Sequence, residues 1–256
     1  MSVIASRDNA RVRRWRSLAR DARTRRREAR ALIEGEHLVA AFLDAGGKAE
    51  ELLLSKTGAA RFEAVSKRAG KSPVLLSDPV FRSIADAETP AGIAAEIALP
   101  PPGVDLHKAP SCVFMDGIQD AGNVGAILRS AAAFGIRHAV LGKGCADAWS
   151  PKVLRAGMGA HFAMALLEGD LAGAIGRFAG KLCCTVPRGG AALTEADLSG
   201  RIGWLFGSEG QGVSNALTAR ADLKLSIPMP GGAESLNVAA AAAICFYELS
   251  RRAARA

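Results

Sequence analysis

The chain has few aromatic side chains and no cysteine pattern typical of a disulfide framework or a zinc site. Aromatic residues make up 5% of its 256 residues, and its five cysteines include no Cys-x-x-Cys pair. An odd number of cysteines within apolar runs indicates buried, reduced thiols and gives no reason to expect a metal. The most apolar stretch, 236–249, is too short and too rich in alanine to span a bilayer. We therefore expect a cytoplasmic protein with no membrane contact.

Two common nucleotide-binding signatures are also missing. The glycines at positions 207, 210 and 212 do not follow the G-x-G-x-x-G order, and no Gly-Lys-Ser/Thr follows them. Both patterns depend on glycines that let the backbone approach phosphates closely. Their absence disfavours a Rossmann-type dehydrogenase or methyltransferase.

Positive charge is present but unevenly spread. The formal net charge is +8, and residues 1–34 hold eleven arginines, no lysine and four acidic residues, which leaves +7 in that segment. A local basic segment favours RNA or DNA, whose phosphates it would contact without reading sequence. A solvated surface helix is the alternative. We expect RNA contacts from the following arginines: Arg11, Arg13, Arg14, Arg25 and Arg26.

Short apolar runs alternate with amphipathic stretches along the whole chain, which predicts an α/β fold. Successive prolines at 100–102 can continue neither a helix nor a strand. We predict a smaller mixed α/β RNA-binding domain over 1–99, a linker over 100–110, and a parallel-sheet α/β domain over 111–256. The expected strands are 31–33, 52–54, 74–76, 92–99, 112–115, 139–141, 182–186, 203–206 and 223–227. The expected helices are 8–22, 36–45, 59–69, 78–84, 124–134, 152–158, 171–179, 213–219 and 236–252.

Three loops carry polar or glycine-rich sequence after predicted strands of the second domain. In the first, 116–129, Asn123 is predicted to cap a helix. In the second, 205–213, three glycines surround Glu209. In the third, 227–237, Ser235 is predicted to cap the last helix, with Asn237 in its first turn. Because α/β folds bind ligands where parallel strands end, we expect the three loops to form one site.

These loops resemble, in order, the three motifs of the SpoU (TrmH) family of RNA ribose 2′-O-methyltransferases, within the SPOUT superfamily. The matching stretches are Asn123-x-Gly125-x-x-x-Arg129, Gly207-Ser-Glu209-Gly-x-Gly212, and Ile227-Pro-Met-x-Gly with Ser235-Leu-Asn237-Val. Upstream, Ile33-Glu-Gly-Glu-His37 and the arginine-rich opening resemble the substrate-binding domain often fused before this family's catalytic domain. Ala121 departs from the Pro that many members carry after Asp120, which alters the stiffness of the turn but no proposed active group.

The resemblance implies a trefoil-knotted C-terminal domain and a homodimer whose active site borders the subunit interface. It implies S-adenosyl-L-methionine as the methyl donor, held largely by backbone groups near four residues: Thr185, Gly207, Ile227 and Leu236. It gives Arg129 a central catalytic role, with support from Asn123, Glu209, Ser235 and Asn237. A guanidinium rarely gives up its proton, so we expect Arg129 to clamp a phosphate and stabilise the developing alkoxide.

The activity expected from this resemblance is methylation of a ribose 2′-hydroxyl in structured RNA. Ribosomal RNA is slightly favoured over transfer RNA, by analogy with the separate N-terminal domain. Two alternatives remain: a catalytically inactive RNA-binding module and a tRNA guanine-base methyltransferase. The presence of all five polar residues of the motifs disfavours the inactive module. The Ser235-Leu-Asn237 motif favours methylation of ribose over methylation of a base.

Overall fold

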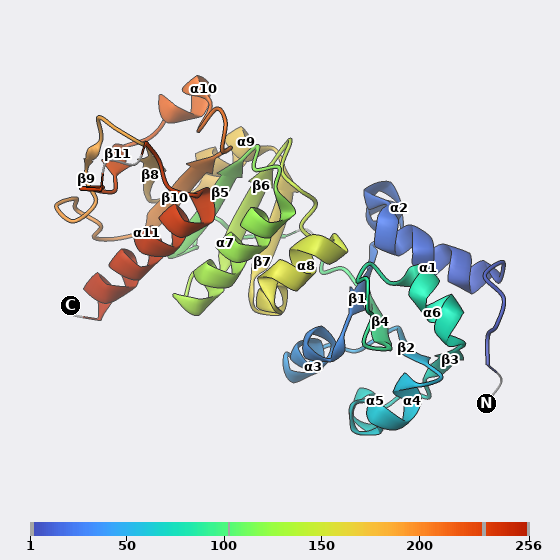
Figure 1. Ribbon diagram of the computed structural model, residues 1–256. Coiled ribbons are helices and arrows are strands. Elements are labelled where there is room, and N and C mark those ends of the chain that lie inside the picture. Colours follow the sequence, from blue (N-terminus) through green and yellow to red (C-terminus); the bar gives the residue numbers. More distant parts are fainter. Residues whose placement is uncertain (1–2, 102, 232–233, 255–256) are drawn as a thin grey trace. The chain divides into compact units, whose positions relative to one another are not determined.

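The computed structural model describes residues 3–101, 103–231 and 234–254 and divides into two compact units (Figure 1). The first unit comprises Met1–Pro101 and Trp149–Phe162, and the second comprises Pro102–Ala148 and Ala163–Ala256. Pro102 of the predicted linker and residues 232–233 of the third loop lie outside the described residues.

The first unit is built on a four-stranded mixed sheet in the order β1-β4-β2-β3. Its strands are β1 (Arg30–Glu34), β2 (Glu51–Ser55), β3 (Val74–Leu76) and β4 (Ile93–Ala98). The β1–β4 and β4–β2 pairs are antiparallel, whereas β2 and β3 are parallel. This mixed arrangement agrees with the predicted character of the N-terminal domain.

One face of this sheet is covered by α1 (Ala10–Arg20) and α6 (Asp78–Ile84). Trp15 and Leu18 of α1 pack with Phe81 of α6 in one buried cluster. The predicted helix over 8–22 corresponds to α1, and a second helix that the sequence did not predict, α2 (Ala22–Glu28), follows it. Asp21 separates them, because its extended backbone ends α1 while its carboxylate accepts the first N–H groups of α2.

The remaining helices of the first unit are α3 (Glu36–Asp44), α4 (Gly58–Arg61), α5 (Glu63–Ala69) and α8 (Pro151–Gly157), followed by a 3₁₀ turn over Ala160–Ala163. The segment Trp149–Phe162 belongs to this unit although it lies between two strands of the second sheet. The Phe162 ring lies edge-on to Phe42 at 5.2 Å, and Arg155 Nη1 pairs with Asp86 Oδ2 at 2.7 Å. The first unit is therefore completed by a piece of chain from the second half of the sequence.

The second unit contains a seven-stranded sheet in the order β7-β6-β5-β10-β8-β11-β9. The strands are β5 (Ser111–Asp116), β6 (His138–Gly142), β7 (Ala165–Gly169), β8 (Lys181–Thr185), β9 (Ala191–Ala192), β10 (Ile202–Gly207) and β11 (Leu223–Ser226). Every pair of neighbouring strands is parallel, which confirms the predicted parallel sheet. The sequence did not predict β7 or β9.

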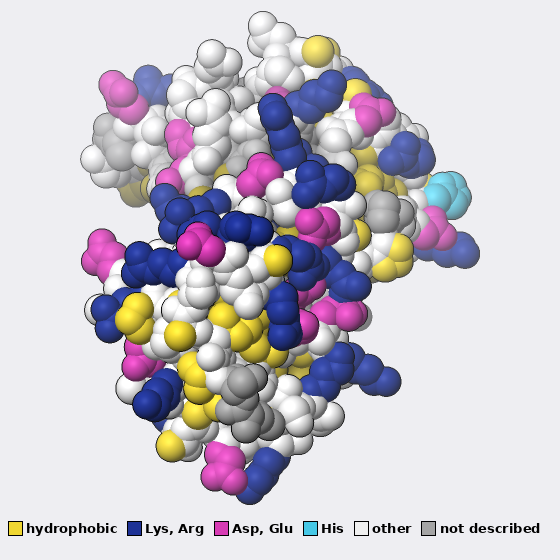
Figure 2. Space-filling view, turned by 90° about the vertical axis from the view of Figure 1, so that its right-hand side faces the viewer, with side chains coloured by type: hydrophobic (Ala, Val, Ile, Leu, Met, Phe, Trp, Pro, Cys, Tyr) yellow, Lys and Arg dark blue, Asp and Glu magenta, His cyan; other side chains and the backbone are white. Residues whose placement is uncertain are grey.

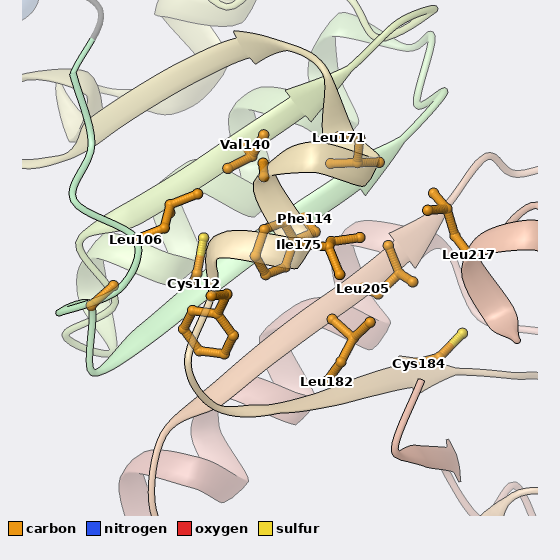
Figure 3. Close-up of a cluster of buried hydrophobic side chains, with 13 residues drawn as sticks. Leu106, Cys112, Phe114, Val140, Leu171, Ile175, Leu182, Cys184, Leu205 and Leu217 are labelled. Atoms are coloured by element: carbon orange, nitrogen blue, oxygen red, sulfur yellow. The ribbon is translucent and has the colours of Figure 1, made fainter. Parts of the chain in front are cut away.

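Helices cover both faces of this sheet. Figure 1 shows α7 (Ala121–Ala133) and α11 (Val238–Ala253) side by side on one face. On that face Phe206 of β10 packs edge-on against Phe246 of α11 at 5.7 Å. On the other face, drawn in Figure 3, α9 (Leu171–Arg177) and Phe178 pack on Phe114 and Leu205. Burial on both faces explains why the central strands are continuous apolar runs.

Most of the cysteines are buried, as their positions in apolar runs predicted. All five cysteines are free thiols; four are buried and Cys145 is partly buried. Burial raises the pKa of Cys183 to about 12, so this thiol stays protonated and unreactive. Within residues 3–101, 103–231 and 234–254, no helix is both long and apolar enough to cross a membrane.

Candidate active site

A pocket of about 680 Å³ lies at the edge of the second sheet where β8, β10 and β11 end. These strands are adjacent and parallel, so the loops that follow them converge. The lining residues are Thr185, Val186, Pro187, Gly207, Ser208, Glu209, Gly210, Gln211, Gly212, Leu225, Ile227, Glu234, Ser235, Leu236, Asn237, Val238 and Ala241. All four residues expected to hold the methyl donor line this one pocket.

The glycine-rich loop after β10 is a closed turn. The backbone N–H of Ser208 donates to Gly212 O at 3.1 Å, and the N–H of Gly212 donates back to Ser208 O at 2.8 Å. A Cβ at Gly207 would lie 2.0 Å from the carbonyl carbon of Gly212, so any side chain there would push the turn apart. The turn leaves Glu209 exposed at its tip.

One chain of hydrogen bonds joins the three predicted motifs. Asn237 Nδ2 donates to Asn123 Oδ1 at 2.9 Å, and Asn123 Nδ2 donates to Glu209 Oε1. The carboxylate of Glu209 therefore orients the amide of Asn123, whose oxygen then accepts from Asn237. Such chains strengthen one another, because each donor is polarised by its own acceptor. Residues 86 and 114 positions apart in the sequence thus form one polar cluster.

Both predicted helix caps were wrong by a few residues. Asp120, not Asn123, caps α7, and its Oδ1 accepts the N–H of Asn123 at 2.7 Å. Asn237, not Ser235, caps α11, where its Oδ1 accepts the N–H of Ala239 at 2.9 Å. Asp and Asn are both good caps, so local preference did not decide between them. The earlier start of α7 leaves the Asn123 side chain available to Glu209.

No role was predicted for Asp116, the last residue of β5. Its Oδ2 accepts the backbone N–H of Ser214 at 2.9 Å. This bond ties the loop after β5 to the loop after β10, which carries Glu209. A carboxylate at the end of an apolar strand was the available signal, since such positions face the ligand edge of a parallel sheet.

Arg129 lies apart from this cluster. It is exposed on α7 and does not line the pocket. Six helical positions separate it from Asn123, which places the two side chains about 120° apart around the helix axis. Among the described residues, Arg129 has no hydrogen-bond or ion-pair partner, so its guanidinium is available to a ligand.

Two of the arginines expected to contact RNA are occupied inside the first unit. Arg14 donates to both oxygens of Glu96 at 2.7 Å and to Glu28 Oε2 at 2.8 Å, which raises its pKa further above the ordinary arginine value. Arg25 is 4% exposed and donates to Leu18 O. The structure therefore does not favour phosphate contact by Arg14 and Arg25, because internal acceptors hold both guanidinium groups and Arg25 is buried.

The other three arginines of that prediction are exposed. Arg13 and Arg26 lie at the surface of α1 and α2. Arg11 is half-exposed, pairs with Glu51 at 2.7 Å and stacks 5.2 Å above the ring of Trp15. An exposed pair of this kind contributes little stability, so a phosphate could replace Glu51 at small cost.

The parallel sheet, the pocket at its carboxyl edge and the polar cluster beside that pocket define an α/β domain with one candidate small-molecule site. A family model described as the SpoU rRNA Methylase family matches residues 110–247, and one described as an MRM3-like substrate binding domain matches 9–95. The chain belongs to the SpoU rRNA methylase family.

One named relative and one solved structure resemble the chain over nearly its whole length, and a second named relative resembles about half of it. A 23S rRNA (guanosine(2553)-2′-O)-methyltransferase from Bacillus subtilis is 35% identical over 97% of this chain and 99% of its own. The human mitochondrial rRNA methyltransferase 3 is 37% identical over 56% of this chain, a match that covers 36% of the human protein. The crystal structure of an AdoMet-bound rRNA methyltransferase from Sinorhizobium meliloti is 26% identical with a TM-score of 0.84, and the match covers 98% of both chains.

Proposed function

We propose that this protein transfers a methyl group from S-adenosyl-L-methionine to a ribose 2′-hydroxyl of ribosomal RNA. The observation that carries the proposal is the single polar cluster of Asn123, Glu209 and Asn237 beside a pocket made from three strand ends. The Bacillus subtilis relative, named for this reaction on 23S rRNA, aligns with both units of the chain. Its full-length similarity favours ribosomal over transfer RNA.

The pocket fits the donor in size and in chemistry. A volume of about 680 Å³ falls within the range of small-molecule sites. Its wall combines apolar surface from Leu225, Ile227 and Leu236 with backbone groups of the closed glycine turn, which suits an adenine ring and its ribose. The donor supplies a methyl group made electrophilic by its sulfonium.

The residues of the chain act on the acceptor ribose and on the geometry of the site. Glu209 accepts from Asn123, and Asn123 accepts from Asn237, so the two amides present an oriented polar edge beside the pocket. Ser235, exposed in the pocket wall, offers a hydroxyl within the same edge. Arg129 is exposed and does not line the pocket of its own unit, so we assign it to the RNA, where its guanidinium would clamp the phosphate next to the acceptor ribose. Stabilisation of negative charge on the 2′-oxygen would require Arg129 to reach a donor pocket, which in the proposed homodimer is the pocket of the partner subunit.

The proposal includes a homodimer. Large apolar side chains remain exposed on α11, with Ile244 at 39% and Tyr247 at 54%, and Leu236 precedes the helix at 38%. The Tyr247 ring packs on Phe134 of α7, so the exposed surface spans both helices. Large apolar side chains left exposed on neighbouring elements are what a protein interface would cover. The trefoil knot and a cytoplasmic location, where bacterial ribosomal RNA is modified, remain part of the proposal.

The test is methyl transfer from labelled S-adenosyl-L-methionine to rRNA and tRNA that lack modifications, followed by digestion to nucleosides. Label in a 2′-O-methylated nucleoside of the rRNA fraction is the expected result. Label on guanine would assign base methylation instead. RNA binding without any label would make the protein a binding module.

A matched pair of variants connects the test to the polar cluster. Asn123→Ala removes the residue that accepts from Asn237 and donates to Glu209, so turnover should fall by about 10²-fold or more. Asn215→Ala, an exposed asparagine at the start of α10 (Asn215–Thr218) outside the cluster, should keep turnover within twofold of the parent.

A further inference from the structure

Helix α1 carries arginines on two flanks that differ in their surroundings. Its buried side chains, Val12, Trp15, Leu18 and Ala19, define the face turned toward the core. At about 100° per residue, Arg11 and Arg14 fall on one side of this face. There they meet carboxylates of the sheet and of α2, namely Glu51, Glu96 and Glu28.

The opposite flank consists of Arg13, Arg16 and Arg20. Their i, i+3, i+7 spacing aligns them along roughly 10 Å of helix within an arc of about 60°. Arg13 and Arg20 are exposed and Arg16 is half-buried. Within the part of the chain that the structure describes, none of the three pairs with a carboxylate. The contact found there is a long one, from Arg20 Nη2 to Ser83 O at 3.4 Å.

The arginines of the first flank are engaged by carboxylates of the same unit, whereas those of the second flank are available to bind an external anion. Three like charges along one flank repel one another unless a polyanion neutralises them. Arginine also presents a planar fork of donors that matches phosphate oxygens. Figure 2, viewed from the side on which α1 and α2 lie in Figure 1, shows Lys and Arg side chains spread widely over this face.

We propose that Arg13, Arg16 and Arg20 form a phosphate-binding ridge that docks the substrate RNA, while Arg14 and Arg25 serve the fold. The inference rests on the proposed function for its RNA substrate and adds where that RNA is held. A ridge of evenly spaced arginines contacts backbone phosphates, so it fixes the position of the RNA without reading its bases.

The experiment measures RNA affinity of the full chain against salt concentration, with unmodified 23S rRNA as the probe. The triple variant Arg13→Gln, Arg16→Gln, Arg20→Gln removes three phosphate contacts. The slope of log K against log salt should fall by about 2 to 3 units, and affinity at 0.1 M salt should fall on the order of 100-fold. Replacement of all three by lysine should retain most of the slope, because the charge remains.

A charge-matched control tests whether position matters. Lys56→Gln, Arg61→Gln and Lys67→Gln remove three exposed positive charges elsewhere in the same unit, around α4 and α5. The control should change the slope by less than about 1 unit. Equal changes in both triples would overturn the ridge in favour of overall charge, and an unchanged slope in the Arg13 triple would overturn it directly.

Two further readouts separate this inference from the proposed function. Donor binding by calorimetry should be the same for the parent and both triples, because the pocket belongs to the other unit. A parent that binds RNA through the ridge without methylating it would refute the proposed reaction and leave the ridge intact. If the parent methylates rRNA and the Arg13 triple variant binds rRNA as tightly as the parent, the ridge is refuted and the proposed reaction stands.

Discussion

Replacing Glu248 by glutamine should destabilise the second unit by removing one buried charge. The Glu248 side chain is 9% exposed on α11 and accepts from Arg251 at 2.7 and 2.9 Å and from Arg252 Nε at 2.6 Å. Arg252 then donates to the backbone oxygens of Leu193 and Thr194 at 3.0 and 2.8 Å. Glu248 therefore orients the guanidinium that fastens the loop after β9 to the last helix.

The magnitude follows from the ionisation of this carboxyl group. Hydrogen bonds from Arg251, then from Arg252, lower the pKa of Glu248 from its ordinary 4.5 to about 2. At about 1.4 kcal/mol per pKa unit the shift corresponds to roughly 3 kcal/mol. Partial exposure of the two arginines reduces this to about 2 kcal/mol. Because the folded pKa is depressed, the contribution is complete above about pH 4.5 and is lost as pH falls toward 2.

The assay is urea unfolding of the full chain at several pH values, with signals assigned to the second unit. At pH 7, Glu248→Gln should lower the free energy of unfolding by about 2 kcal/mol. This difference in unfolding free energy between the parent and the variant, called the gap below, should narrow steadily between pH 5 and pH 3. Glu195→Gln, an exposed carboxylate in the same loop, should change it by less than about 0.5 kcal/mol. A gap at pH 7 below 0.5 kcal/mol, or one independent of pH, would refute the reasoning.

Two further substitutions test the glycine turn and the first unit. Gly207→Ala should weaken donor binding at least about tenfold by calorimetry, since its Cβ overlaps Gly212. Gly210→Ala, which meets open space, should bind within about threefold of the parent, and similar losses in both would contradict the close-packing argument. Glu96→Gln removes the 3%-exposed carboxylate that faces Arg14, and should lower the stability of the first unit by about 3 kcal/mol in urea. A loss under 1 kcal/mol would show that water already satisfies Arg14.

Apolar runs predicted every strand that is buried by two neighbours, and missed the two at the edges of the second sheet. β7 is half-buried along its whole length, and β9 has two residues that pair with β11 alone. Edge position alone is not the cause, because β1 and β3 are edge strands of the first sheet and their apolar runs were predicted; β7 and β9 lack a fully buried run, and β9 is also very short. Their pattern therefore resembles that of a loop.

The loops of the site were predictable, but the bonds within them were not. The sequence predicted one site for the three loops; the second and third loops line one pocket, and Asn123 of the first loop is joined to them by hydrogen bonds. The partners of Asn123 depend on residues 86 and 114 positions away, and the ranking of cap residues is too flat to choose between Asp120 and Asn123. Similarly, the number of arginines is known from the composition, but the hydrogen bond between Arg14 and Glu96, 82 positions later, depends on the tertiary fold.

The fourteen-residue segment Trp149–Phe162 constrains the order in which the chain can fold during its synthesis. The first unit lacks α8 and the Phe42–Phe162 contact until residue 162 has left the ribosome, although its own sheet ends at Ala98. At about 5 to 20 residues per second, that wait lasts roughly 3 to 13 seconds. During it, β5 and β6 of the second sheet have already emerged. A nascent chain stalled near residue 110 should therefore hold an incomplete first unit, and transplanting that unit into another protein requires both of its segments.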